Sequence, residues 1–445
     1  MSSRRRIIQV QEKVPLKIGI PLSLQHMFAM FSASVLVPVL FGINPAIVLL
    51  MNGVGTLIFI AITGGKSPAY LGSSFAFLAP TFLILANPRM GYEYALGGFV
   101  VSGAVFCLCA IAVKFFGTEW INVLLPPAAM GPVVALIGLE LAGVAASNGL
   151  LTSTTYQAVE GTDYFAKVYQ GLDYKIVAVF VFTLAVAVFG SILFKKFLSC
   201  IPILIAIIAG YIVSIPLGIV DFTAISEASV FAIPNFSFPK FDITAITIIL
   251  PATLVVISEH IGHQIVTSTI VGKDLLKDPG LHRTLLSDGV STMLSGFCGS
   301  VPTTTYGENI GVMAITKVYS VWVIGGAAVC SILVSFIGKV SGAIQTIPGP
   351  VMGGVSFLLY GMIAASGIRL MVDDKVDYSK SRNLALTAVT FVTGLSGAAI
   401  RLGEVQLKGM ALATVVAMLL SLCFYIIDKL GLANDMEGDD AEIAE

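Results

Sequence analysis

The sequence predicts an all-α membrane protein that crosses the bilayer many times. Hydrophobic residues make up 56% of its 445 residues and charged residues only 11%, whereas water-soluble domains carry about 25% charged residues. Long apolar runs separate the few charged residues, and the two halves of the chain resemble each other weakly. The net charge of −1 gives no indication of a nucleic-acid partner.

The apolar runs locate the expected spans, because a helix of about 20 apolar residues crosses a bilayer. Residues 18–65 lack Asp, Glu, Lys and Arg and are long enough for two spans. Further spans are expected, in chain order, at 67–88, 94–113, 120–139, 176–194, 197–220, 243–271, 289–307, 318–338, 340–368, 383–400 and 409–427. The short piece Asn309–Thr316 cannot cross alone, and we count it as part of a fourteenth span.

The positive residues favour fourteen spans with both termini in the cytoplasm. In that arrangement 18 of the 25 Lys and Arg residues lie inside, as the positive-inside rule requires. If Asn309–Thr316 were not a crossing, the cluster Lys375–Arg382 would lie outside. The amino terminus carries Arg4–Arg6 without a small-residue cleavage pattern, so no signal peptide is expected.

An internal repeat underlies the fold prediction. Asn52–Thr56 resembles Asp288–Thr292, and Pro126–Gly131 resembles Pro348–Gly353. Seven spans in each repeat is an odd number, so the second repeat must be inverted in the membrane. Inverted repeats are typical of secondary transporters, which bind their substrate at the repeat interface.

The repeat also predicts two breaks in the helices. Tyr70–Phe75 precedes the apolar piece Ala76–Ala86, and Tyr306–Asn309 precedes Ile310–Thr316. Each is interpreted as an extended segment followed by a half-helix. Irregular backbone at membrane depth must be satisfied by protein or a polar cavity, so the two extended segments are expected to pair as short antiparallel strands. The amino ends of both half-helices would then point into one cavity.

Ionisable residues inside apolar spans are functional candidates, because burying them is costly. These residues are Glu140, Glu259, Glu308, His26, His260 and His263. Glu259 and His263 share a helical face at i, i+4, whereas His260 is rotated about 100° away towards another helix. Glu140 is expected to pair with a loop residue, and His26 to donate a hydrogen bond in helix packing. His260 and His263 lack a third ligand, so no metal site is expected.

Two carboxyl groups beside a histidine suit a proton-coupled carrier. A protonated carboxyl donates a hydrogen bond, an ionised one accepts two, and a histidine exchanges protons with either. Such a set is well matched to a ligand that alternates N–H and C=O groups.

The stretch Glu308–Lys317 resembles the signature of the nucleobase–ascorbate transporter (nucleobase:cation symporter-2) family: Gln, Glu or Pro, then Asn-x-Gly, four residues, Thr, and a basic residue or Gly. The match is complete. Four other segments resemble the bacterial uracil-transporting members: Pro21–His26, Ala69–Phe77, Glu259–His263 and Tyr306–Gly311. The resemblance covers roughly residues 15 to 430.

The resemblance implies fourteen spans in two domains. The core domain comprises 14–118 (spans 1–4) and 241–346 (spans 8–11), and the gate domain comprises 119–220 (spans 5–7) and 347–430 (spans 12–14). Residues 431–445 form an acidic cytoplasmic tail. Members of the family are commonly homodimers through the gate domain, embedded in the lipids of the cytoplasmic membrane.

The resemblance also assigns the site residues. Glu259 and Glu308 hydrogen-bond the base, assisted by the backbone N–H groups of Phe75 and Gly307. His263 takes part with Glu259 in proton coupling. The remaining assignments are a pocket lining of Ala33, Phe75, Tyr306 and Tyr360, with Asn309, His26 and Ser74 in support.

The expected function is symport of uracil with a proton, without a cofactor. A purine such as xanthine or another pyrimidine is the alternative substrate within the same family. A nucleobase-permeable channel and an intramembrane enzyme are rivals from other classes, and an enzyme is not expected because the metal-ligand set is incomplete. A primary pump is disfavoured because the chain lacks a G-x-x-x-x-G-K-[ST] phosphate loop.

Overall fold

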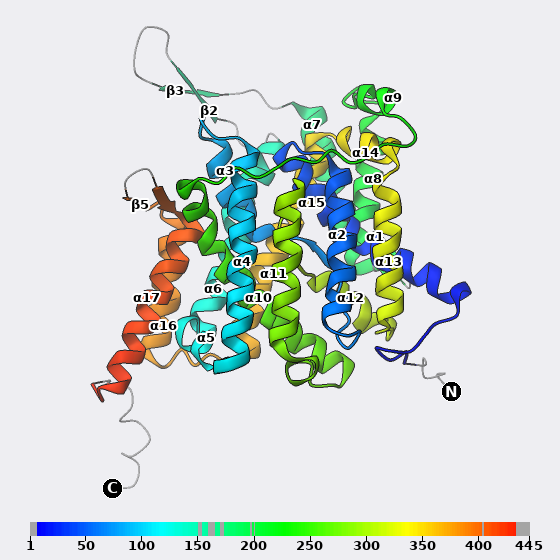
Figure 1. The fold of residues 1–445 in the computed structure, drawn as a ribbon. Coiled ribbons are helices and arrows are strands. Elements are labelled where there is room, and N and C mark those ends of the chain that lie inside the picture. Colours follow the sequence, from blue (N-terminus) through cyan, green and yellow to red (C-terminus); the bar gives the residue numbers. More distant parts are fainter. Residues whose placement is uncertain are drawn as a thin grey trace.

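A computed structural model describes residues 7–149, 154–158, 165–169, 173–195, 198–199, 201–402 and 405–432. The first half contains α1 (Leu16–Phe41), α2 (Pro45–Ile62), β1 (Leu71–Ser73), η1 (Phe75–Phe77), α3 (Leu78–Leu85), α4 (Tyr92–Phe116), α5 (Glu119–Leu124), α6 (Pro127–Asn148), β2 (Thr154–Ala158), β3 (Phe165–Tyr169), α7 (Tyr174–Leu193), α8 (Pro202–Ser214) and α9 (Thr223–Glu227) (Figure 1).

The second half contains α10 (Ile243–Val271), η3 (Leu276–Gly280), α11 (Leu281–Cys298), β4 (Thr303–Thr305), α12 (Gly307–Thr316), α13 (Val321–Ser335), α14 (Gly338–Gln345), α15 (Gly349–Asp373), α16 (Ser381–Leu395), β5 (Ala399–Leu402), β6 (Val405–Lys408) and α17 (Gly409–Lys429). Helices therefore dominate, and the strands are short antiparallel pairs: β1 with β4, β2 with β3, and β5 with β6.

Eight of the described helices are long and apolar enough to cross a membrane: α1, α2, α4, α6, α7, α10, α15 and α17. Shorter apolar helices at Phe75–Leu85, Pro202–Ser214 and Val321–Ser335 coincide with three other expected spans. The chain is thus a multi-pass membrane protein, which confirms the class predicted from composition.

The apolar runs located the helices better than they located the helix ends. Glu140 lies inside α6, which runs nine residues past the expected span end at 139, and Asp288 lies inside α11, which begins at Leu281 and not at 289. The expected span 340–368 is divided into α14 and α15, because Pro348 precedes the new helix and Pro350 occupies its first turn. The Asp242 carboxylate accepts hydrogen bonds from the first free N–H groups of α10, and the Ser320 hydroxyl does the same for α13.

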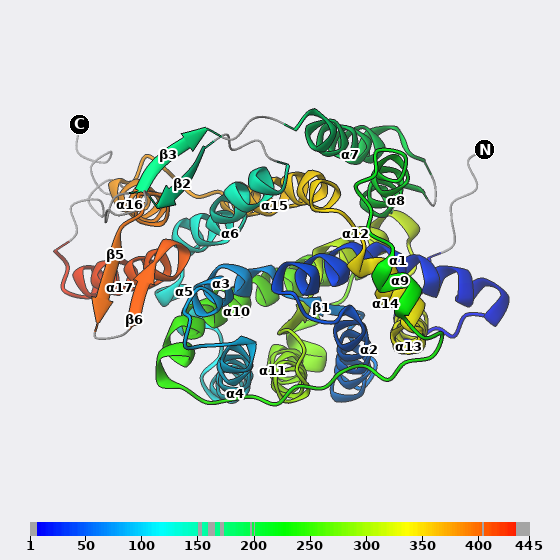
Figure 2. The same ribbon diagram turned by 90° about the horizontal axis from the view of Figure 1, so that it is seen from above.

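The helices form two groups (Figure 2). One group packs α1, α2, α4, α10, α11 and α13 together, and the other packs α6, α7, α8, α15, α16 and α17. Small residues allow the closest crossing, between α6 and α15. A Cβ atom at Gly138 would lie 2.0 Å from the carbonyl oxygen of Tyr360, and one at Gly367 would lie 2.4 Å from that of Gly131. Van der Waals packing at such crossings holds membrane helices together.

Candidate functional site

The strands β1 and β4 pair at the centre of the first helix group. Leu71 lies opposite Thr305, Gly72 opposite Thr304, and Ser73 opposite Thr303. The pairing confirms the prediction that two broken helices meet through antiparallel strands. The second strand lies at Thr303–Thr305, however, and not at Tyr306–Asn309, where an extended segment was expected; residues 307–309 already belong to α12. Glu308 is therefore a helical residue.

Gly72 allows the two breaks to approach closely. A Cβ atom at Gly72 would lie 1.8 Å from Cε2 of Tyr306, so any side chain there would displace the tyrosine ring. The ring packs over β1, and the Tyr306 hydroxyl donates to the carbonyl oxygen of Ser73. The Ser74 N–H donates to the carbonyl oxygen of Pro302 (2.9 Å). These contacts place the starts of η1 and α12 beside each other.

Two carboxyl groups lie close to this junction. Glu308 is in the first turn of α12, where the free backbone N–H groups and the helix dipole favour a negative charge. Glu259 lies on α10, which packs against both α12 and α11. Both glutamates are half-buried. The arrangement offers two adjacent groups that accept or donate hydrogen bonds at the edge of a polar ligand.

His263 lies against the start of α12. Its Nδ1 is 3.3 Å from the Thr305 hydroxyl, and a Cβ atom at Gly307 would lie 3.3 Å from its Nε2. The His263 side chain thus forms its hydrogen bond across to β4, and among the described residues it forms none with Glu259 on the same helix. The His263 ring therefore lies beside Gly307, the residue whose backbone N–H is the expected ligand donor.

Asp288 is a site residue that sequence reasoning missed. Its Oδ2 lies 2.8 Å from Nδ1 of His260, and both side chains are fully buried. Thr284 Oγ1 lies 2.9 Å from the other ring nitrogen of His260, and Thr305 Oγ1 lies 3.3 Å from Nδ1. Because Thr305 contacts both His260 and His263, the network links the buried aspartate to the start of α12. His260 therefore faces a neighbouring helix, as its rotation from Glu259 predicted.

His26 and Asn309 connect α1 to α12. Asn309 Nδ2 donates to Nδ1 of His26 (2.7 Å), and both side chains are fully buried. His26 is thus a helix-packing residue, as expected, but its ring accepts the hydrogen bond from Asn309 and does not donate it. Ser74, the third supporting residue, has a buried hydroxyl without a hydrogen-bond partner among the described residues.

The aromatic residues bring the two helix groups together. The ring of Phe75 meets that of Tyr360 edge to face with centroids 6.4 Å apart, and Tyr360 belongs to α15 of the other group. Tyr306 is buried beside Gly72. The side chain of Ala33, also expected in the pocket, lies outside the described residues, and so does most of the expected acidic tail.

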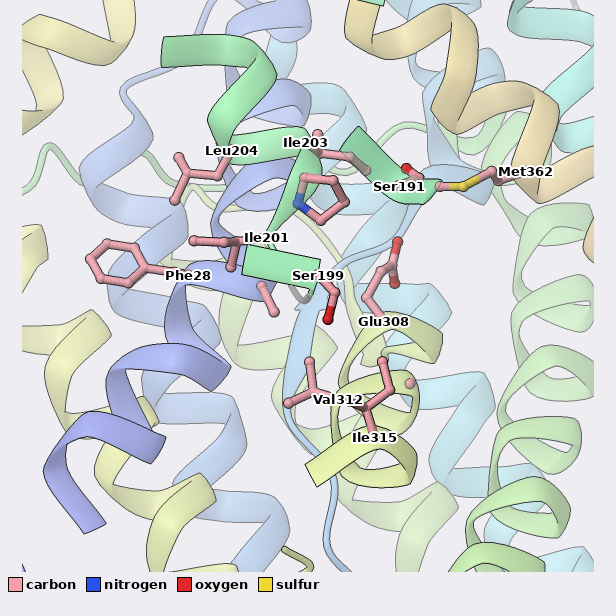
Figure 3. Close-up of a pocket in the computed structure, with 13 residues that line it drawn as sticks. Phe28, Ser191, Ser199, Ile201, Ile203, Leu204, Glu308, Val312, Ile315 and Met362 are labelled. Carbon is pink, nitrogen blue, oxygen red and sulfur yellow. The ribbon is translucent and has the colours of Figure 1, made fainter. Parts of the chain in front are cut away.

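A cavity of about 180 Å³ begins at Glu308 (Figure 3). Of the predicted binding residues that the structure describes, Glu308 alone lines it. Its other walls come from α1, α7, α8, α12, α15 and the segment before α8. The cavity therefore lies between the two helix groups.

Two other candidates from the sequence, Glu140 and a histidine metal site, lie outside the proposed binding residues. Glu140 accepts a hydrogen bond from the backbone N–H of Met410 (3.0 Å) at the start of α17, so its partner is a helix residue and not the loop residue that was expected. His260 and His263 both contact the Thr305 hydroxyl, and among the described residues no three His, Cys, Asp or Glu side chains gather in a way that suits a metal ion.

Comparison with known proteins decides the family. Residues 18–403 match the model of the permease family that includes xanthine and uracil permeases. The chain belongs to this family. Its membership confirms the resemblance seen in Glu308–Lys317 and identifies the protein as a permease, not an enzyme.

Curated relatives of this permease match it along nearly the whole chain. The uracil permease of Paenibacillus larvae is 56% identical over 430 residues, which cover 97% of this chain and 99% of the relative. The uracil permease of Escherichia coli K12 is 56% identical over 443 residues, covering 99% of each chain. The uracil permease of Bacillus subtilis is 45% identical over 408 residues, covering 90% of this chain and 91% of the relative.

Solved structures of anion transporters share the fold of this permease. The transmembrane domain of the cyanobacterial bicarbonate transporter BicA superposes with a TM-score of 0.60 at 13% identity, covering 96% of this chain and all of that domain. Murine Solute Carrier 26 family member A9 gives a TM-score of 0.70 at 9% identity, covering 94% of this chain and 69% of the other. At such identities the likeness concerns the fold alone.

Proposed function

We propose that this permease imports uracil together with a proton across the cytoplasmic membrane. The observation that carries the proposal is the position of Glu308, at the start of α12, which packs against the helix that carries Glu259. Uracil alternates N–H and C=O groups along its edge, which matches carboxyl groups and backbone N–H groups. The relatives named uracil permease, at 56% identity over nearly the full length, support the choice of substrate.

The binding site in this proposal combines both helix groups. Glu259, Glu308 and the N–H groups of Phe75 and Gly307 hydrogen-bond the base. Tyr306, Tyr360 and Ala33 complete the lining, and the Phe75–Tyr360 contact supports a site at the boundary between the groups. Asn309, His26 and Ser74 hold the half-helices in position.

His263 and Glu259 carry the proton in this proposal. His263 contacts Thr305, and its ring faces the position that a Cβ atom of Gly307 would occupy, so a change in its charge acts on the start of α12. If protonation favours the state that accepts uracil, uracil must raise the proton affinity by the same factor.

The proposed architecture is fourteen spans in two inverted repeats. The pairing of β1 with β4, which come from corresponding parts of the two halves, supports it. The first helix group corresponds to the core domain (14–118 and 241–346) and the second to the gate domain (119–220 and 347–430). Both termini then lie in the cytoplasm, and two copies associate through the gate domain. Crosslinking in membranes and sided labelling of the termini test these two points.

Uptake of radiolabelled uracil into proteoliposomes tests the function. An imposed pH gradient, acidic on the substrate side, should drive saturable accumulation above the external concentration, and dissipating the gradient should abolish it. Unlabelled nucleobases compete in parallel assays. Stronger competition by xanthine than by uracil would assign a purine substrate, and flux without saturation or accumulation would assign a channel.

A further inference from the structure

The segment between α9 and α10 crosses one end of the first helix group. Residues 228–242 contain no helix, and we call them the strap. Figure 2 shows the strap running past the ends of α2, α11 and α4, and Figure 1 shows it at the face of the molecule opposite the first described residues. Because α2 and α4 are long enough to cross the membrane, the strap lies at one membrane surface.

The backbone of the strap is bound near both of its ends. The Ala232 N–H donates to the carbonyl oxygen of Phe336, just after α13 (3.0 Å), and the Lys240 N–H donates to that of Glu93 in the first turn of α4 (2.8 Å). The Lys240 Nζ also lies 2.9 Å from the Glu93 carboxylate. The strap therefore connects the ends of helices that lie far apart in the sequence.

Two glycines let the strap lie directly on the helix ends. A Cβ atom at Gly299, at the end of α11, would lie 2.5 Å from the backbone nitrogen of Ser237. A Cβ atom at Gly97 on α4 would lie 2.2 Å from the carbonyl oxygen of Lys240. Such contacts leave no room for large side chains between the strap and the helices, so the strap presents its large side chains on its other face.

That other face is apolar and uncovered. Exposed fractions between 48% and 78% are found for six large apolar residues of the strap: Val230, Phe231, Ile233, Phe236, Phe238 and Phe241. Large contiguous apolar surfaces of this kind mark contacts with a partner or a membrane. The exposed polar residues Asn235 and Lys240 lie among them, and such a mixture is typical of segments that lie in a membrane interface.

The apolar surface of the helices continues up to the strap. Phe297, in the last turn of α11, is exposed and precedes Cys298, whose carbonyl oxygen accepts a hydrogen bond from the Ser237 N–H (3.4 Å). Leu333, in the last turn of α13, is also exposed, three residues before the Phe336 that binds the strap. Exposed apolar residues on membrane-embedded helices face lipid, so the face of the strap extends a lipid-facing surface.

The irregular backbone fixes the depth of the strap. Lipid-exposed irregular backbone does not occur in the hydrocarbon core, because its N–H and C=O groups would lack partners there. The backbone therefore lies where water and headgroups supply hydrogen bonds, and only the side chains reach the acyl chains. The strap also runs along the side of the first group that faces away from the second group (Figure 2). A dimer formed through the gate domain, as proposed above, leaves that side uncovered.

We propose that the strap is an interfacial element that holds the ends of the first helix group together at one surface of the bilayer. Its exposed apolar side chains lie among the acyl chains next to the headgroups, and its backbone lies at the level of the phospholipid headgroups. The partner is the lipid surface itself, bound through apolar area and not through one particular headgroup. This role does not depend on the transported substrate.

Tryptophan fluorescence of the full-length protein measures the depth of the strap. The two native tryptophans are removed in Trp120→Phe/Trp322→Phe, and Phe238→Trp or Ile233→Trp is added. The protein is reconstituted in phosphatidylcholine that is brominated near either the headgroup end or the methyl end of its acyl chains. We expect the headgroup-end bromines to quench both strap tryptophans at least twofold more strongly. Leu108→Trp, an exposed position within α4, is the control and should be quenched more strongly by the methyl-end bromines.

Hydrogen–deuterium exchange in lipid nanodiscs tests whether lipid contact keeps the strap on the helices. Phe238→Glu places a charge on the apolar face and should draw the strap towards water. We expect the peptide that contains Ser237 and Lys240 to exchange at least fivefold faster than in wild type. Asn235→Glu is the matched control, because it adds the same charge to the strap at an exposed polar residue, and its exchange should match that of wild type.

Four results overturn the inference. Quenching of the strap tryptophans by aqueous iodide and by neither brominated lipid would place the apolar face in water, free for a soluble partner. Protection from all three quenchers would mean that protein, such as a second copy of the chain, covers the face. Stronger quenching by the methyl-end bromines would place the strap in the hydrocarbon core. Exchange in Phe238→Glu at the wild-type rate would show that lipid contact does not hold the strap in place.

Discussion

Asp288 and His260 form a fully buried pair, with Oδ2 of the aspartate 2.8 Å from Nδ1 of the histidine. The pair joins α11 to α10, and Thr305 extends it to β4. The other carboxylate oxygen of Asp288 has no hydrogen-bond partner among the described residues. Burying a carboxylate with one oxygen unpaired is costly. Its partner on α10, His260, is next to Glu259 in the sequence.

The first prediction concerns this pair. Asp288→Ala removes an acceptor from a buried imidazole, and leaving a buried polar group unsatisfied costs about 1–3 kcal/mol. Asp288→Asn keeps an oxygen acceptor and should cost less. Thermal unfolding in detergent should therefore rank wild type above Asp288→Asn and Asp288→Ala lowest.

Asp278→Ala is the matched control for the buried aspartate. Asp278 pairs with Lys66 at 2.7 Å, but both side chains are largely exposed. Exposed ion pairs contribute about 1 kcal/mol or less, so the unfolding midpoint should stay close to that of wild type. Equal losses in Asp278→Ala and Asp288→Ala would show that burial of the Asp288–His260 pair has no special role.

The second prediction tests the close approach of the two breaks. Gly72→Ala places a methyl group on the ring of Tyr306, and overpacking of this kind costs about 1–3 kcal/mol. We expect a lower unfolding midpoint and weaker uracil binding. The double variant Gly72→Ala/Tyr306→Ala removes the clash, so its loss of stability should be smaller than the sum of the two single losses. Additive losses would show that the ring and Gly72 do not constrain each other.

The third prediction concerns the carboxyl group that carries the proposed function. Glu308→Gln replaces a charged acceptor with an amide, and losing a hydrogen bond to a charged group costs about 1.5–3 kcal/mol. Uracil affinity should fall roughly ten- to a hundredfold in a binding titration. Tyr360→Ala should reduce affinity less, because it removes only contact area.

Glu140→Gln is the control for Glu308→Gln. Glu140 is also a half-buried carboxyl group within the membrane, but it accepts from the Met410 N–H, and an amide oxygen accepts the same hydrogen bond. The uracil affinity of Glu140→Gln should therefore equal that of wild type. Unchanged affinity in Glu308→Gln would remove Glu308 from the binding site.

The sequence predicted the parts of this molecule that local pattern determines. Apolar runs located the helices, and the Gly- and Ser-rich break Tyr70–Phe75 located the first of the paired strands. The second strand lies just before its expected position at Tyr306–Asn309. On α10, the spacing from Glu259 predicted that His263, at i+4, lies on the same helical face and that His260, at i+1, faces another helix. The complete signature Glu308–Lys317 predicted the family.

Features that depend on tertiary packing were not predictable in the same way. Asp288 borders the apolar run 289–307, so it resembled a residue at the membrane surface, and only the early start of α11 at Leu281 places it inside. Thr305 falls inside the expected span 289–307, and its contacts with two histidines require the strand pair. The cavity forms where 201–204 approaches α12, and nothing in either segment alone indicates the other.

The final prediction concerns His263 and separates proton coupling from binding. The imidazole contacts Thr305 and lies beside Gly307, while the donors at Phe75 and Gly307 and the carboxyl group of Glu308 remain when it is removed. If His263 and Glu259 carry the proton, His263→Ala should lower uptake driven by a pH gradient at least tenfold and change uracil affinity far less. The dependence of affinity on pH should also flatten, because proton and substrate affinities are linked reciprocally. Calorimetry across pH and gradient-driven uptake measure the two effects, with His282→Ala, at a histidine near the start of α11 and outside the site, as the control. If His263 only orients the site, binding and uptake should fall together, and uptake in His263→Ala that still follows the pH gradient at the wild-type rate would end the proton-relay hypothesis.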